Sequence, residues 1–277
     1  MSAESEGRAA AERFRANHHL GFHPLGDLVT LIEQTTSADV AVLDTEVDQH
    51  GMTMKRGEMG RLHIAVARTR RPMRQRSTLA HELAHVVFED WSDTPEVDSS
   101  SPAESRANAF ARHLLIPLSG VNDLVTDSSR HADLVVLSKV VQWFQVSPSI
   151  AAIALEQAGY IDAPTKARFK AETTPRLAAR FGWTDQYHAL QIESNRRRAP
   201  QRLLARAISG WQQNVVSAEM IATLRGLDVE SAERELRDAG IVRSKITPAW
   251  TDPADLPAAD IDLTELDAAE LGDGGPA

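Results

Sequence analysis

The order of apolar and polar residues predicts two helices and a small sheet in the first part of the chain. Residues 6–18 are rich in Ala and Arg, and residues 25–35 carry their apolar side chains on one helical stripe, so both segments are expected to be helical. Residues 39–44 form a run of β-forming residues. Residues 51–56 and 61–67 flank a turn that contains two glycines, which is typical of a hairpin. Together these segments predict a sheet of about three strands that follows a helix.

The chain after this sheet has the pattern of a series of helices. One helix is expected at about 77–89, and the next at about 102–115, where a proline stops it. Two more, at about 133–144 and 148–158, meet at a Ser-Pro pair that suits an N-cap and a first helical turn. These two helices have the spacing of a helix–turn–helix. The predicted fold class is therefore α+β, a mostly helical domain with a small sheet.

Composition divides the chain into four expected parts. Residues 1–160 form the α+β domain and include the helix–turn–helix-like segment 133–158. Residues 161–199 are polar and irregular in pattern, which indicates a linker or a surface extension. Residues 200–250 are expected to form a small helical C-terminal domain. Residues 251–277 are expected to be an acidic, disordered tail, because Asp, Ala, Pro and Gly dominate them.

Charge and cysteine content limit the chemistry that this chain can perform. The net charge is −9, but residues 251–277 hold eight of the 39 acidic residues and no Lys or Arg. The rest of the chain therefore has 31 acidic and 30 basic side chains, and this near-neutral balance gives no general electrostatic reason to bind nucleic acid. The sequence has no cysteine, so disulfides and thiolate metal sites are excluded, and any metal ligand must be His, Asp or Glu.

The chain shows no targeting or membrane signal. Its first residues include several acidic side chains and no apolar core of a signal peptide. No run of about 18 apolar residues occurs, which argues against a membrane span. A cytoplasmic location without membrane association is therefore expected.

The helix expected at 77–89 carries an HExxH motif made of His81, Glu82 and His85. The four-residue spacing of the histidines puts both imidazoles on one face of a helix, where they can hold one metal ion. Glu82 falls beside them and can reach a water molecule on that ion. The alternative is a pair of buried histidines whose polar atoms are satisfied within a core helix.

A third ligand is needed, since a catalytic zinc takes three protein ligands and keeps one open position. Glu104 is the leading candidate, and Asn108 lies one turn further on the same face, where it could orient an imidazole from the second shell. The alternative for Glu104 is an exposed acid stabilised by the helix dipole. Four other acids are alternatives. Glu89 and Asp90 follow the second His too closely to fold back easily, and Asp93 and Glu96 lie in the next loop.

The segments RSTLAHELAHVVF and ESRANAFARHLLIP together resemble the ImmA/IrrE family of metallo-endopeptidases. The first matches the family's TLAHELGH-type helix, and the second its Glu-x-x-Ala-Asn-x-Phe-Ala helix with a Leu-x-x-Pro stop. The resemblance covers residues 25–160, with Ala84 where Gly is usual. It implies a zincin-like fold with a zinc site, although a His₂Glu site also accepts Mn²⁺ or Fe²⁺. The implied zinc ligands are His81, His85 and Glu104, and the implied general base is Glu82.

The resemblance also implies a substrate and a cellular role. The expected substrate is a helix–turn–helix repressor of the XRE type, whose cleavage would relieve repression in a stress response or a mobile element. Two alternatives remain: a zinc-containing regulator that sequesters the repressor without cutting it, and a DNA-binding transcription factor. Glu82 favours the enzyme, because zinc binding alone needs no general base. The second helix of segment 133–158 has no Lys or Arg, which disfavours direct DNA binding.

Three features keep two interpretations each. Strand 61–67 is either an ordinary strand or a sheet edge that pairs with an extended substrate. Arg-rich segments at 68–76 and 196–206 are either solvated faces or docking sites for an acidic partner. The side chain that stabilises the oxyanion is not identified by sequence, and each eligible residue has an ordinary structural alternative; the eligible residues are His63, His113, His131, Tyr160 and Tyr187.

Overall fold

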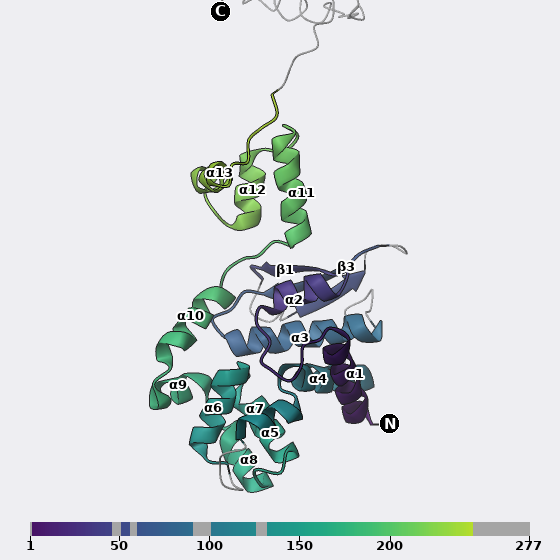
Figure 1. The fold of residues 1–277 in the computed structure, drawn as a ribbon, viewed down its shortest axis with the longest axis vertical. Coiled ribbons are helices and arrows are strands. Elements are labelled where there is room, and N and C mark those ends of the chain that lie inside the picture. The colour runs from purple at the N-terminus through teal and green to yellow at the C-terminus, as the bar shows by residue number, and fades with distance from the viewer. Residues whose placement is uncertain (1, 46–50, 56–59, 91–100, 126–131, 246–277) are drawn as a thin grey trace, which may run out of the picture. The chain divides into compact units, whose positions relative to one another are not determined.

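A computed structural model describes most of the chain (Figure 1). The described residues are 2–45, 51–55, 60–90, 101–125 and 132–245. They form thirteen helices and three strands, which confirms the expected α+β class with a small sheet. All of these elements belong to one compact unit, Met1–Val242, and a second unit comprises Arg243–Ala277. The predicted acidic tail at 251–277 lies outside the described residues.

The sheet consists of β1 (Asp39–Leu43), β2 (Gly51–Lys55) and β3 (Leu62–Ala67) in the order β1-β3-β2. β2 runs antiparallel to β3 with Thr53 opposite Ile64, so the predicted hairpin pairing is confirmed. β1 pairs parallel with the other side of β3. β3 is therefore the central strand, and the hypothesis that it offers a free edge to a substrate is wrong. Among the described strands, β1 and β2 are the two edge strands, and Val42 of β1 forms an isolated antiparallel bridge with Arg198.

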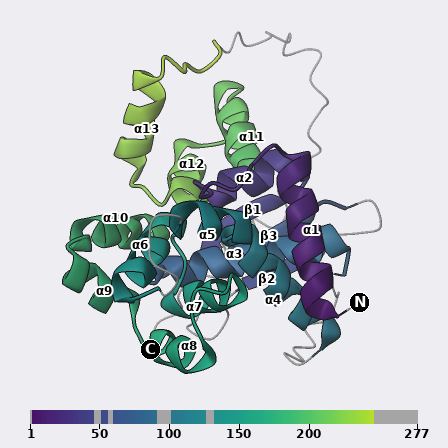
Figure 2. The ribbon, with the colours of Figure 1, turned by 60° about the horizontal axis from the view of Figure 1, so that its bottom comes forward.

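Four helices build the main core together with this sheet (Figures 1 and 2). They are α1 (Ala3–Asn17), α2 (Leu28–Thr35), α3 (Pro72–Phe88) and α4 (Pro102–Leu115). α3 contacts both β2 and β3, and α4 packs between α3 and α1, so α3 separates the sheet from α4 and α1. Leu83 of α3 and Phe110 and Leu114 of α4 are fully buried at helical spacing, which fixes the faces that meet.

Further helices extend the same core. They are α5 (Leu118–Val125), α6 (Leu134–Phe144), α7 (Pro148–Gln157), α8 (Ala163–Lys170), α9 (Thr174–Phe181) and α10 (Thr184–Ser194). α6 and α7 correspond to the bent pair expected at 133–158. In the described part of the chain, no single helix is long and apolar enough to cross a membrane, and only α6 with α7, bent by 111°, reaches that length and composition jointly.

The expectation of irregular structure at 161–199 is wrong, because this segment folds into α8, α9 and α10. The segment is polar on average, but three of its apolar side chains, Phe169, Leu177 and Trp183, are buried in the main core. The indole nitrogen of Trp183 donates to the hydroxyl of Ser138 on α6 at 3.0 Å. A few well-placed apolar side chains are therefore enough to order a segment whose average composition is polar.

The C-terminal part, which was expected to be helical, contains α11 (Gln201–Gln212), α12 (Ala218–Arg225) and α13 (Val229–Asp238). They enclose their own hydrophobic cluster, in which Trp211 and Leu236 are buried. Independent folding of residues 200–250 as a domain stays a prediction.

Candidate metal centre

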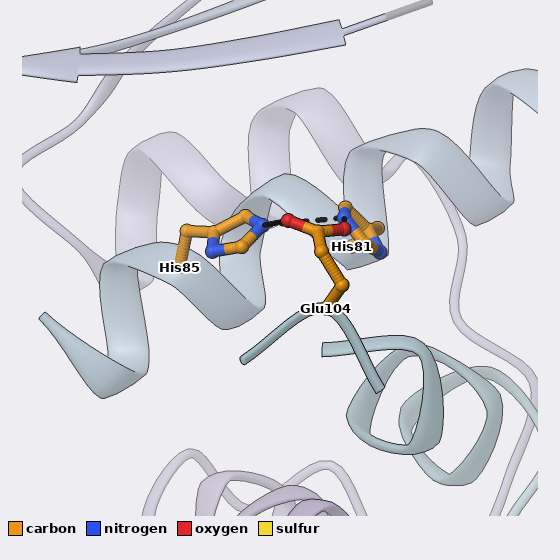
Figure 3. Close-up of side chains that lie close together, drawn as sticks. All are labelled: His81, His85 and Glu104. Atoms are coloured by element: carbon orange, nitrogen blue, oxygen red, sulfur yellow. Dashed lines mark hydrogen bonds and ion pairs between the residues drawn. The ribbon is translucent and has the colours of Figure 1, made fainter. Parts of the chain in front are cut away.

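His81 and His85 on α3 and Glu104 in the first turn of α4 point their side chains toward one another (Figure 3). The two Nε2 atoms lie 3.2 Å apart. Glu104 Oε2 lies 3.0 Å from His81 Nε2, and Glu104 Oε1 lies 3.3 Å from His85 Nε2. α4 is oriented for this contact by its N-cap, where the Ser101 hydroxyl accepts a hydrogen bond from the Glu104 amide.

The spacing of these atoms fits one divalent metal ion. Two ligands that are each bound about 2.0–2.1 Å from a tetrahedral zinc ion lie about 3.4 Å apart. The observed separations of 3.0 to 3.3 Å are close to that value. Two imidazole nitrogens and one carboxylate also form a ligand set typical of a catalytic zinc site. The three side chains are partly exposed, so solvent or a substrate can reach an ion held between them.

Each imidazole has a polar partner on its outer nitrogen. Asn108 Oδ1 lies 3.1 Å from His81 Nδ1, and Asp90 Oδ1 lies 2.9 Å from His85 Nδ1. An oxygen acceptor at Nδ1 keeps the proton on that nitrogen and leaves the Nε2 lone pair facing inward. The structure thus places Asn108 in the position that its spacing from Glu104 predicts.

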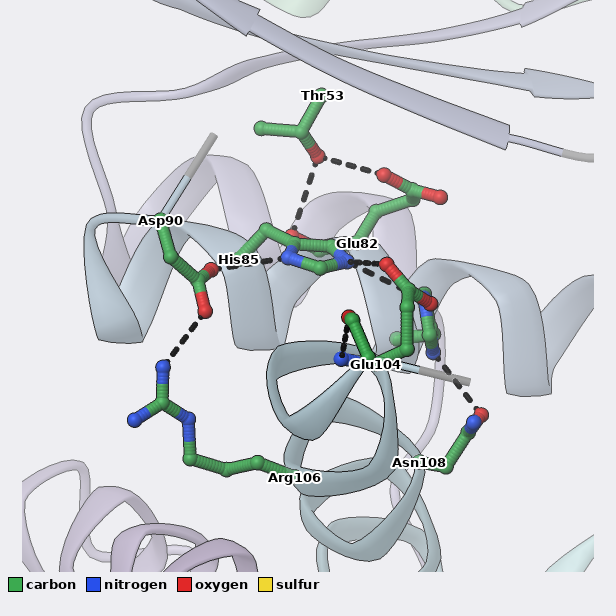
Figure 4. A network of polar contacts seen from close by, with 9 residues as sticks. Thr53, Glu82, His85, Asp90, Glu104, Arg106 and Asn108 are labelled. Atoms are coloured by element: carbon green, nitrogen blue, oxygen red, sulfur yellow. Dashed lines mark hydrogen bonds and ion pairs between the residues drawn. The ribbon is translucent and has the colours of Figure 1, made fainter. Parts of the chain in front are cut away.

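Asp90 and Arg106 belong to a polar network that sequence reasoning missed (Figure 4). Arg106 Nη2 donates to Asp90 Oδ2 at 2.7 Å, while Asp90 Oδ1 faces His85. The guanidinium of Arg106 also lies 4.1 Å from the centre of the Phe88 ring. Asp90 was considered only as a direct ligand, whereas the structure places it on the outer side of an imidazole. Of the three other acidic alternatives, Glu89 is the C-cap of α3, and Asp93 and Glu96 lie outside the described residues.

Glu82 points away from the three converging side chains and toward β2 (Figure 4). The hydroxyl of Thr53 donates to Glu82 Oε2 at 2.7 Å, and both residues are buried. β2 approaches closely because its first residue is glycine: a Cβ on Gly51 would lie 2.7 Å from Glu82 Oε1. Burial raises the pKa of Glu82, while the hydrogen bond from Thr53 and the charges of the two nearby histidines act in the opposite direction. Sequence patterns gave no signal for Thr53, because its role depends on strand order.

Two of the side chains considered for oxyanion stabilisation have other partners. His113 is buried on α4, and its Nε2 lies 2.9 Å from Glu4 Oε1. Tyr187 is buried edge-on against Trp183 in the core. His131 lies outside the described residues.

The comparison with protein families adds one finding. Residues 35–156 match the family model of the IrrE N-terminal-like domain, Peptidase_M78. The match begins just before β1 and ends in α7, so it contains the HExxH helix and the helix that carries Glu104. No curated protein matches the chain.

Proposed function

The chain belongs to the ImmA/IrrE family of metallopeptidases through its IrrE N-terminal-like domain at residues 35–156, and we propose that it is a zinc-dependent endopeptidase. The observation that carries this proposal is the convergence of His81, His85 and Glu104 on one point. The burial of Glu82 beside them supports the peptidase over a purely structural metal site, because a structural site needs no additional carboxylate.

In the proposed mechanism, His81, His85 and Glu104 hold the ion, with zinc as the first choice and Mn²⁺ or Fe²⁺ compatible with the same donors. When bound there, such an ion would supply the Lewis acidity that makes water a nucleophile near neutral pH. Glu82 accepts the proton of the attacking water and then passes it to the leaving amine. Its buried position strengthens this role, since a carboxylate in a low-dielectric environment is a stronger base than one in water.

We propose that β2, rather than β3, receives the substrate backbone. β2 is an edge strand of the sheet, and no other described strand pairs with its outer side, so an extended peptide could pair there with its backbone. Thr53 faces Glu82, while Met52 and Met54 on the alternate positions are exposed. A peptide added to this edge would therefore lie next to the general base.

The proposed substrate is an XRE-type repressor in the cytoplasm, and the support for it is the family to which the domain belongs. Direct binding to DNA is not part of the proposal. α7 carries no basic residue, and several arginines of the Arg-rich segments are already paired with carboxylates of the same chain. These pairs include Arg198 with Asp27, Arg197 with Asp44 and Arg202 with Asp39.

The test compares cells that express the wild type with cells that express Glu82→Ala, by mapping all new protein N-termini at rest and under stress. The substitution removes the base and leaves the three proposed ligands intact. New termini in one repressor-like protein, seen only with the wild type, would support the peptidase and identify its substrate. Identical termini in both strains would contradict it and favour sequestration of an uncut repressor.

A further inference from the structure

The end of α3 folds back on the metal centre through a left-handed residue. Glu89 adopts φ 55° and ψ 35° at the C-cap of α3. Because of this turn, the amide of Asp90 donates to the carbonyl of His85 at 3.2 Å, and the Asp90 side chain returns to the His85 ring. A straight continuation of the helix would carry Asp90 away from His85. The left-handed turn at Glu89 therefore allows Asp90 to contact His85, although the two residues are close in sequence.

Arg106 holds the Asp90 carboxylate from the second helix of the site. It lies two residues after Glu104 on α4, and its Nη2 donates to the carboxylate oxygen that His85 does not use. The Phe88 ring supports one face of the guanidinium, and Glu6 Oε2 of α1 lies 3.5 Å from Nη1. Asp90 is therefore fixed by two partners, one on each carboxylate oxygen.

We propose that Asp90, held by Arg106, is the positioning residue that orients His85 and strengthens metal binding at this centre. A carboxylate on Nδ1–H raises the basicity of the opposite nitrogen and restricts rotation of the ring. His81 has only a neutral amide, Asn108, at the equivalent place. The two histidines thus differ in the partner of the outer nitrogen, a carboxylate for His85 and an amide for His81. The inference rests on the metal site of the proposed function but does not require peptidase activity.

The experiment measures zinc affinity of the full-length chain by competition with a coloured chelator at fixed pH. Asp90→Ala should weaken zinc binding by about 10- to 100-fold. Asp90→Asn keeps an oxygen acceptor and should fall between Asp90→Ala and wild type. Arg106→Ala should weaken binding less than Asp90→Ala. The double variant should be no weaker than Asp90→Ala alone, because Arg106 acts through Asp90.

Controls separate this role from simple support of the fold. Glu12→Ala removes an exposed carboxylate that pairs with Arg8 on α1, and zinc affinity should not change. Thermal unfolding of each metal-free variant reports stability independently of the metal. The visible spectrum of the cobalt-substituted protein should change in Asp90→Ala and be restored toward wild type in Asp90→Asn.

Wild-type zinc affinity in Asp90→Ala, or a loss of stability without a change in affinity, would overturn the proposal. If Asp90→Ala does not fold, the zinc affinity and stability of Asp90→Asn and Arg106→Ala test the proposal in its place. If the wild type and these variants bind zinc equally well, only the proposed role of Asp90 is contradicted. A wild-type chain that binds no zinc contradicts this inference and the proposed function together.

Discussion

At the scale of single residues, the centre depends on side chains that touch the HExxH motif rather than on the motif alone. Thr53 donates to the carboxylate of Glu82, and Asn108 and Asp90 each face the outer nitrogen of one imidazole. Each of these contacts restricts a rotamer that would otherwise be free. The three HExxH side chains could be predicted from spacing, because a helix fixes which positions share a face. Glu104 lies on another helix, and its choice over other acids came from the family resemblance.

Replacement of Thr53 by Val should reduce cleavage without loss of metal. Val preserves the shape of Thr and removes the hydroxyl that holds Glu82. A hydrogen bond to a charged group contributes about 1.5–3 kcal/mol, so cleavage should slow by about tenfold or more. The measurement is the rate at which the cleaved product accumulates, together with zinc content. Thr53→Ser, which retains the hydroxyl, should cleave at close to the wild-type rate; an equal loss in both variants would contradict the account, because the missing hydroxyl could then not explain the effect of Val.

At the scale of elements, the close approach of β2 to α3 determines how Glu82 is covered. A Cβ on Gly51 would lie 2.5 Å from the Thr78 methyl carbon and 2.7 Å from Glu82 Oε1. Gly51→Ala should therefore push β2 from α3 and lower the free energy of unfolding by about 1–3 kcal/mol. Urea unfolding measures this change. Gly26→Ala is the matched control, because no atom lies within 4 Å of its added Cβ; an equal effect in both variants would contradict the account.

Sequence periodicity predicted most elements but not how they are arranged. The hairpin of β2 and β3 is local, and its alternating pattern was sufficient. The central place of β3 depends on the parallel pairing of β1, a choice that no local pattern encodes. α8 to α10 were missed because their burial rests on a few anchors such as Leu177 and Trp183. The contact of Asp90 with His85 was missed because it requires a left-handed turn at Glu89.

At the scale of the whole molecule, α1 is tied to α4 and α7 by one carboxylate. Glu4 interacts with Arg112 and His113 of α4, and Gln157 of α7 donates to it at 2.8 Å. Burial alone would raise the pKa of Glu4, but the hydrogen bonds from Arg112, His113 and Gln157 outweigh it and lower the pKa to about 2. The carboxylate is therefore stabilised by folding, and α1 is held in place on the face of α4 that lies against it.

This depressed pKa predicts that Glu4 contributes stability that depends on pH. The contribution is fully present above the unfolded-state pKa, about 4.5, and is lost as pH falls from there toward about 2. Glu4→Gln should therefore lower the melting temperature at pH 6 to 7. The difference from wild type should shrink as the pH is lowered below about 4.5. Thermal melts across this range test the prediction, and a difference that stays constant with pH would contradict it.

The most direct test of the central claim is the zinc content of purified chains after exhaustive dialysis against metal-free buffer. The wild type and Glu82→Gln should each retain about one zinc ion per chain, since the proposed role of Glu82 is that of a base and not of a ligand. His81→Ala, His85→Ala and Glu104→Ala should each lose the ion, because two remaining ligands hold zinc weakly. Retention of zinc by His85→Ala and Glu104→Ala, or its loss in Glu82→Gln, would contradict the account.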